Sequence, residues 1–555
     1  MKKLLLASAL AGLSLAVGFT ALAGDKGPHV DPARLSDHVK VLSGDDFAGR
    51  GPATPGERLT TDYIIWQMKR MQLEPGGDIK DGKRTWTQDV PLARFAMSGE
   101  VKTTVTAGGA TESWTQGDQI AIRAAQTNQD HVTVKDAPMV FVGYGVKAPE
   151  RNWDDFKGVD LKGKIAVVLI NDPDFETGSG DFGGKAMTYY GRWTYKYEEA
   201  ARQGAVGLLI IHETAPASYG WATVKNSNTN VQFDIVREHP EAAHAPVEAW
   251  IQRDTAVDLF KKSGLDFDAL KKQAQGRDFK PVVLTGATFS TDFGVDHRQI
   301  VSHNVVGMLS GTKHPDQIVM YTAHWDHLGV GLPDAKGDKI YNGAVDNADG
   351  VASLLEVARS FAVSPRTERS VVFMAVTAEE KGLLGSTYYA SHPLFYLSKT
   401  VGVLNVDAMD TDGPAKDMST SGDGHVGLQD DLIAVLKAHG RTFSPDRNPG
   451  GGHFYRSDHF PFAKAGVPAI SVNSGQDLVS GGVEAGAAWK TAYTKDRYHQ
   501  PADEWTKDMD FTGIAQDMDL LVEVGMGLAN SGRWPEWQTG SEFKAIRDAS
   551  AADRK

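Results

Sequence analysis

The sequence of 555 residues contains no cysteine. Neither a disulfide framework nor a lipid anchor attached to a cysteine can therefore form. The chain also lacks a GxSxG nucleophile elbow and a Walker phosphate-binding loop. These absences argue against a serine hydrolase of the α/β-hydrolase type and against a P-loop nucleotide hydrolase.

A long basic run is missing as well, and the formal net charge at pH 7 is -13. Nucleic acids and anionic membranes are bound mainly through clustered lysine and arginine. We therefore expect no nucleic-acid partner, and no membrane partner once the N-terminal segment described next is removed.

Long apolar runs are absent except at the start of the chain. Residues 1–23 combine Lys2 and Lys3, an apolar stretch and a small-residue ending, Ala21-Leu22-Ala23. This pattern predicts a cleaved secretory signal peptide, and hence a periplasmic or secreted bacterial protein. The alternative, a retained membrane anchor, is disfavoured because the run is short and no basic stop-transfer segment follows.

The rest of the chain is long enough for more than one domain, and the whole sequence is 41% hydrophobic. The pattern of helix-like and strand-like segments changes along the chain. Two helix-like stretches dominate residues 24–135, and short apolar strands dominate residues 136–285. Strands and amphipathic helices alternate over residues 286–533, and residues 534–555 are expected to form a polar, loosely held tail. This alternation predicts an α/β fold, with a mainly parallel mixed sheet flanked by helices and a β-rich insertion.

Candidate metal ligands end three of the expected strands. They are His324, Asp326 and His327 in "TAHWDH", Glu379 and Glu380 in "TAEE", and Asp407 and Asp410 in "NVDAMD". Buried acids without counter-charges would repel one another and be costly to desolvate, whereas cations placed among them remove both problems. Imidazole nitrogen and carboxylate oxygen are ligands typical of zinc.

Two further residues complete a possible two-metal set. Asp346 lies in "GAVDNADG", a glycine-bounded loop that enters a helix, where its carboxylate could bridge two ions. His499 lies in the proline-containing loop "DRYHQPAD" and is a candidate last ligand. Two ions that share a water lower its pKa and make it a nucleophile.

The motifs "AHWDH", "GAVDNADG", "TAEEKGLLGS", "NVDAMD" and "RYHQPAD", in this order, resemble the co-catalytic zinc peptidases of family M28. This is the aminopeptidase and glutamate-carboxypeptidase group. The segments "HVKVLSGDDFAGRG" and "SDHFPFAKAGVPAI" resemble other parts of the same family. Residues 136–285 resemble a protease-associated (PA) domain, which many members carry as an insertion.

The resemblance implies a role for each matching residue. Two zinc ions would be held by five ligands: His324, Asp346, Glu380, Asp407 and His499. Asp346 would bridge the ions, with His324 and Asp407 on one side and Glu380 and His499 on the other. Glu379 would be the general base and Tyr498 would hydrogen-bond the developing oxyanion, while Asp326 would orient His324 or brace the bridging group.

Other residues have weaker assignments. In "GGGHFYRSDHFPF" we expect a wall of the substrate pocket, formed by Tyr455, Arg456, Asp458 and His459, with a solvated loop as the alternative. Asp349, in the first turn of a helix, is expected to be structural. His327 is expected to brace a ligand or lie at the surface rather than bind metal.

The expected function is a secreted two-zinc exopeptidase, with an aminopeptidase favoured, that hydrolyses N-terminal peptide bonds of peptide substrates through a metal-bridging water. A carboxypeptidase or dipeptidase of the M28 type acting on acidic substrates is the alternative, which Arg456 would support. A one-zinc glutaminyl cyclase and an inactive binding homologue are disfavoured because no ligand of the two-metal set is missing.

Overall fold

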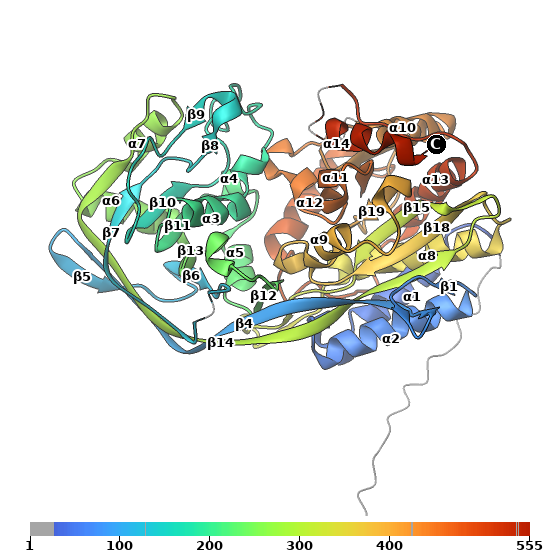
Figure 1. Ribbon diagram of the computed structural model, residues 1–555, viewed down its shortest axis with the longest axis horizontal. Helices are drawn as coiled ribbons and strands as arrows, with labels where there is room; N and C mark the ends of the chain where they lie inside the picture. Colours follow the sequence, from blue (N-terminus) through green and yellow to red (C-terminus); the bar gives the residue numbers. More distant parts are fainter. Residues whose placement is uncertain (1–26, 128, 423–425, 540, 542, 555) are drawn as a thin grey trace, which may run out of the picture.

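The computed structural model of the protein describes residues 27–127, 129–422, 426–539, 541 and 543–554. The predicted signal peptide lies outside the described residues. Two lobes stand side by side, a larger one that contains both ends of the described chain and a smaller one (Figure 1). None of the helices in the described part combines the length and the apolar character that crossing a bilayer requires.

Two long strands connect the lobes. Strands β4 (Thr87–Ala107) and β14 (Val282–Leu309) pair antiparallel over most of their length and run from one lobe into the other. The chain between them forms the smaller lobe, which is therefore an insertion held at both ends by the same pair of strands.

The sheet of the larger lobe follows the order β21-β20-β22-β19-β15-β18-β14. Its parallel centre consists of β15 (His314–His324), β18 (Arg369–Val376), β19 (Thr400–Val406) and β22 (Ala469–Ser474). Strands β14 and β20 (Asp417–Thr420) pair with it antiparallel, and β21 (Thr442–Phe443) lies at the edge. The predicted fold class, a mostly parallel mixed sheet flanked by helices, is confirmed.

Helices cover this sheet, since every residue of β18 and β19 is buried. Helices α1 (Pro32–Leu42), α8 (Asp349–Val363) and α13 (Thr512–Ala529) contact one another, and α8 and α13 contact the central strands. Helix α2 (Pro55–Arg70) lies against β14, and α9 (Leu384–Ser391) against α11 (His459–Lys464). The remaining long helices are α10 (Gly427–Ala438) and α12 (Gly482–Asp496).

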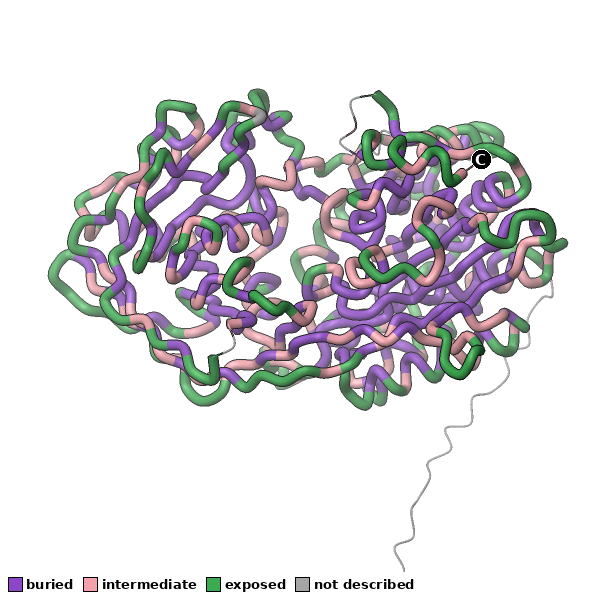
Figure 2. The backbone as a smooth tube through the Cα atoms, viewed as in Figure 1, coloured by how far each residue is buried: buried purple, intermediate pink, exposed green. Residues whose placement is uncertain are grey.

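The smaller lobe has its own parallel strands, β7 (His131–Phe141), β10 (Ile165–Leu169), β11 (Gly207–His212) and β13 (Val247–Gln252). Helices α3 (Trp193–Arg202), α5 (Trp221–Asn228), α6 (Arg253–Lys262) and α7 (Phe267–Ala274) belong to this lobe. Figure 2 shows buried backbone in the strands of both lobes, so each has its own core.

The smaller lobe begins before residue 136, the predicted start of the insertion. Strand β6 (Ile120–Arg123) pairs with β13, and the second half of β4 pairs with β5 (Ala110–Ser113) and β14. The composition changes at about residue 136, but strand pairing begins earlier in the chain. The assignment of this lobe to the PA class stays a prediction.

The C-terminal segment corrects another expectation. Residues 534–555 were expected to be loosely held, yet Trp537, Phe543 and Arg547 are buried against the larger lobe. Arg547, in helix α14 (Lys544–Ala549), donates to the carbonyl oxygen of Thr400 at 2.9 Å. These three buried residues are widely spaced, and each is flanked in the sequence by solvated residues. The composition of the segment is therefore polar and does not indicate that it packs against the larger lobe.

Candidate metal centre

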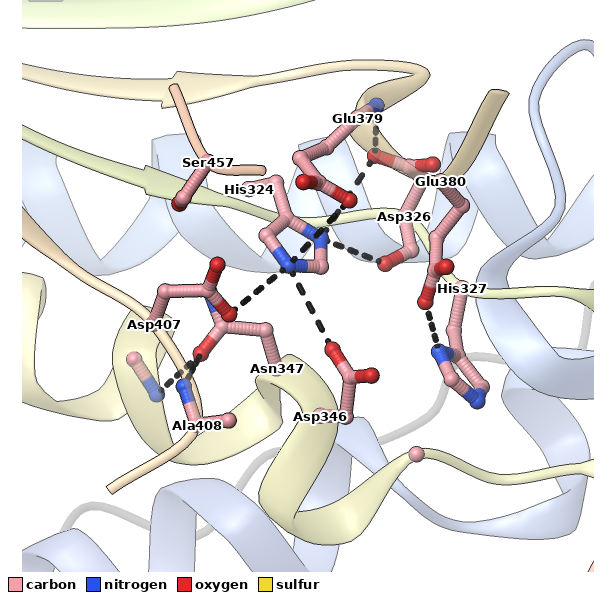
Figure 3. Close-up of polar contacts among 12 residues, drawn as sticks. His324, Asp326, His327, Asp346, Asn347, Glu379, Glu380, Asp407, Ala408 and Ser457 are labelled. Carbon is pink, nitrogen blue, oxygen red and sulfur yellow. Dashed lines mark hydrogen bonds and ion pairs between the residues drawn. The ribbon is translucent and has the colours of Figure 1, made fainter. Parts of the chain in front are cut away.

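The ends of three neighbouring strands bring the predicted ligands together. His324 is the last residue of β15, Asp407 follows β19, and the turn η6 (Glu379–Lys381) follows β18. Because β15 lies between β19 and β18, these side chains meet at one edge of the sheet (Figure 3).

The first group of ligands is centred on His324. Its Nε2 lies 3.3 Å from Asp407 Oδ1 and 3.4 Å from Asp346 Oδ1. Its Nδ1 donates to the carbonyl oxygen of Asp326 at 3.1 Å. This bond keeps the proton on Nδ1 and leaves the Nε2 lone pair directed at the carboxylates, as a metal-binding imidazole requires.

The second group is centred on Glu380. His499 Nε2 lies 3.0 Å from Glu380 Oε2 and 3.1 Å from Asp346 Oδ2, and His327 Nδ1 lies 2.5 Å from Glu380 Oε1. Asp346 therefore turns one oxygen to each group. His327 is fully buried, so the expectation that it could lie at the surface is wrong: the strand end turns inward there.

The donor set fits zinc. One atom each from His324, Asp346 and Asp407 lie within 4.8 Å of one another, as do atoms of His327, Asp346 and Glu380. These are imidazole nitrogens and carboxylate oxygens, the donors that zinc takes in proteins.

The electrostatics of this edge are dominated by burial. Burial raises the pKa of Glu379 well above its usual range, and the carboxylates of Asp407 and Glu380 add to the effect while His324 opposes it. Burial likewise raises the pKa of Asp326 to about 7. A bound cation would favour the charged form of each carboxylate and would therefore lower the pKa of both Glu379 and Asp326.

The two aspartates with assigned supporting roles lie close to the ligands. The carboxylate of Asp326 accepts the backbone N–H of Glu379 at 3.0 Å, and its Oδ1 lies 3.8 Å from His324 Nδ1. Asp349 is buried in the first turn of α8 and accepts the N–H of Met409 at 3.3 Å.

Sequence reasoning missed several residues that shape the loop around Asp346. Asn347 Oδ1 accepts the N–H of Ala408 at 3.1 Å, which ties the loop to the residue after Asp407. Asp503 Oδ2 accepts the N–H of Asp346 at 3.0 Å. Asp503 belongs to the quoted motif "RYHQPAD", so its place in the motif was a signal that could have pointed to it.

A glycine is required at the start of this loop. Gly343 has φ 57°, in the left-handed region, and a Cβ there would collide with the carbonyl oxygen of Asp346 and the ring of His327. A side chain at residue 343 would therefore displace the backbone of Asp346 and the ring of His327.

The smaller lobe also reaches the ligands. His499 Nδ1 lies 2.8 Å from Ser227 Oγ, and the carbonyl oxygen of His499 accepts Asn226 Nδ2 at 3.0 Å. Both partners belong to α5 (Trp221–Asn228), so a helix of the insertion orients a predicted ligand of the larger lobe. No motif in the sequence indicates this contact.

Two cavities adjoin the site. One of about 540 Å³ extends between the lobes, and one of about 210 Å³ is lined mainly by the larger lobe together with Ser218 and Tyr219 of the smaller lobe. Glu379 and Tyr498 line both. Arg456 Nη2 donates to Tyr498 Oη at 3.0 Å.

The predicted pocket wall is only partly exposed to these cavities. Tyr455 and Arg456 line the larger one. Asp458 and His459 are fully buried and line neither, because they lie at the start of α11 behind the wall. Asp458 instead accepts Ser386 Oγ at 2.5 Å.

Comparisons with known proteins agree with this geometry. Residues 304–524 match the model of peptidase family M28. The glutamate carboxypeptidase 2 homolog of Caenorhabditis elegans is 29% identical over 395 residues, covering 61% of this chain and 46% of that protein. The probable lipoprotein aminopeptidase LpqL of Mycobacterium tuberculosis is 25% identical over 325 residues, covering 56% and 54%.

Among solved structures, an aminopeptidase from Aneurinibacillus sp. strain AM-1 superposes with a TM-score of 0.54 and 19% identity, covering 91% of this chain and 96% of that one. At this identity the likeness establishes the fold alone. The chain spans about half the length of these two curated relatives. The region that matches the model of peptidase family M28 contains all five predicted ligands, so this part of the chain is similar to that family in the segment that carries the candidate metal centre.

Proposed function

We propose that the protein is a secreted two-zinc exopeptidase, and specifically an aminopeptidase that hydrolyses the N-terminal bond of peptides. The observation that supports this most directly is the position of Asp346, whose two oxygens face separate groups of histidine and carboxylate ligands. A carboxylate shared between two such groups is typical of a co-catalytic pair of metal ions.

The ligands divide between two zinc ions. His324 and Asp407 would hold one and Glu380 and His499 the other, with Asp346 shared. When bound, zinc ions polarise the scissile carbonyl and lower the pKa of water.

Glu379 is the proposed general base. It adjoins the ligand groups, with Oε2 3.9 Å from His324 Nε2, and its carboxylate faces both cavities. It would take a proton from the attacking water and deliver it to the leaving amine nitrogen.

Tyr498 is the proposed oxyanion donor. Its hydroxyl oxygen accepts a hydrogen bond from Arg456, which leaves its own proton free to be donated. The charge of Arg456 also strengthens that donor, so the pair is suited to stabilise negative charge that develops on a carbonyl oxygen.

We infer that the smaller lobe is a PA domain that closes the mouth of the site and filters substrates. The support is that the larger cavity has walls from both lobes and that α5 contacts His499.

The test is a panel of aminoacyl and C-terminal dipeptide substrates on the purified protein, before and after chelation. Hydrolysis of free N-terminal substrates should disappear with a chelator and return with zinc, at a zinc content of two per chain. Hydrolysis that survives full metal removal would refute the metal mechanism.

A carboxypeptidase acting on acidic substrates is the second candidate, and Arg192 favours it. This side chain of the smaller lobe is 8% exposed, lines the larger cavity near Arg456, and its Nε has no partner among the described residues. A buried guanidinium without a carboxylate partner could hold a substrate carboxylate. Faster cleavage of N-acetylated peptides ending in glutamate than of peptides with a free amine would favour this candidate.

A further inference from the structure

Two cationic side chains that line the larger cavity have no role in the proposed reaction. The cavity starts at Glu379 and extends to strands β13 and β12 (Gln232–Ile235) of the smaller lobe. Lys381 lines it from the larger lobe and Arg123 lines it from the smaller lobe. Its volume of about 540 Å³ is in the range of sites that bind small ligands.

The side chain of Lys381 is buried in the wall of the larger cavity. Its side chain is 5% exposed, and its Nζ has no hydrogen-bond partner and no ion pair among the described residues. A buried ammonium group in this state is costly, and proteins usually pair such groups. An unpaired lysine that faces a cavity therefore indicates an anionic group that binds there.

Arg123 is buried and forms an ion pair with Glu248. It is 6% exposed, lies over the rings of Trp193 and Tyr197 at 5.1 and 5.8 Å, and its Nε has no hydrogen-bond partner among the described residues. Glu248 lies 3.5 Å from that Nε. The guanidinium is thus held rigidly by aromatic rings with its donors incompletely used.

The acids of this region are already engaged. Glu248 Oε1 contacts His244 at 2.7 Å, and His244 also contacts Asp234 at 2.8 Å. Asp234 in turn accepts Arg237 Nε at 2.6 Å. The charges of Glu380 and Asp326 act on Lys381, but no carboxylate of the described residues forms an ion pair or a hydrogen bond with its Nζ.

We propose that Lys381 and Arg123 form a subsite for a substrate carboxylate, namely the free C-terminal carboxylate of a short peptide. The inference rests on the proposed aminopeptidase function: with the N-terminal residue at the metal ligands, the rest of a short peptide lies in the adjoining cavity and ends in a carboxylate. Arg123 supplies planar donors and Lys381 a point charge, and a carboxylate between them would relieve their mutual repulsion. Because Lys381 belongs to the larger lobe and Arg123 to the smaller one, the two lobes together would select peptides by length.

The test compares di-, tri- and tetrapeptides that carry either a free C-terminal carboxylate or a C-terminal amide. For the zinc-loaded wild-type protein we expect KM for at least one acid to be about tenfold or more below KM for its amide. Lys381→Met should bring this ratio close to one, with kcat and zinc content unchanged. Lys381→Gln serves as a second variant if the first does not fold.

Lys464 provides the matched control. It lines the same cavity but is exposed at its rim, so Lys464→Met removes the same charge without changing the buried end. Its acid-to-amide ratio should equal that of the wild-type protein. A further pair of amidated peptides, ending in glutamate or glutamine, distinguishes a side-chain carboxylate from the C-terminal one.

The outcomes separate the two proposals. Hydrolysis with equal KM for acids and amides at every length overturns the subsite, while leaving the aminopeptidase function intact. A Lys381-dependent preference for the glutamate side chain alone overturns the C-terminal assignment. If the zinc-loaded protein hydrolyses no peptide at all, the proposed function is refuted. The subsite is then tested by binding alone, and it is refuted if peptides with a free C-terminal carboxylate bind no more tightly than their amides.

Discussion

Arg50 offers a sharp test of how the metal centre is supported. Its side chain is fully buried, and its guanidinium donates to four backbone carbonyl oxygens. Nε donates to Trp325 at 2.8 Å, Nη1 to Leu42 at 3.0 Å and Asn342 at 2.6 Å, and Nη2 to Gly343 at 2.8 Å. One arginine thus joins the N-terminal segment to the two loops that carry His324 and Asp346.

The size of the effect of Arg50→Met follows from these four bonds. A hydrogen bond from a charged donor contributes about 1.5–3 kcal/mol, so four of them give at least about 6 kcal/mol. Removing the guanidinium also removes the several kcal/mol that its burial costs. We therefore expect a net loss of about 3–5 kcal/mol in the free energy of unfolding, together with weaker zinc binding.

The assay is urea unfolding followed by near-ultraviolet circular dichroism, with a zinc titration of the folded variant. Arg58→Met is the control, since the Arg58 side chain is 71% exposed and forms an ion pair with Asp62 at 3.3 Å. If Arg50→Met unfolds at the same urea concentration as Arg58→Met and binds zinc normally, the role assigned to Arg50 is refuted.

Further predictions concern the paired glutamates and the smaller lobe. Glu379→Gln should keep the wild-type zinc content and lower kcat by about 10²–10⁴-fold. Glu380→Gln should instead lose zinc. Near-normal turnover of the Glu379→Gln variant would contradict the assignment of Glu379 as the base. His244, held between Glu248 and Asp234, has a pKa raised to about 9, because these carboxylates outweigh the effect of burial. Its charge should therefore contribute up to about 3 kcal/mol of stability below pH 6.5, and the contribution should be lost as the pH rises through about 9. His244→Gln should accordingly destabilise the protein strongly at pH 6 and weakly at pH 10 in thermal unfolding, and an equal loss at both would count against this.

The central strands and their polar ends could be predicted from the sequence because both depend on local pattern. A strand buried on both faces must be continuously apolar, so the acids at the end of "SVVFMAV" and after "TVGVLNV" stand out. The carboxyl ends of parallel strands lie at the same edge of a sheet. The residues that follow these strands in the sequence could therefore be predicted to lie close together as candidate ligands. The polar tail was misjudged because its anchors, such as Arg547, act singly and leave no periodic pattern.

The sequence by itself therefore determined the fold class and the chemistry of the metal-binding edge, since strand burial and ligand type are properties of residues. Only the tertiary structure decided that Asp346 turns one oxygen to each group of predicted ligands, that Ser227 of the insertion contacts His499, and that the Nζ of Lys381 has no hydrogen-bond partner among the described residues. These facts depend on contacts between segments far apart in the chain. The directions of side chains across such contacts follow from the packing of the two lobes, and no local pattern of residues specifies them.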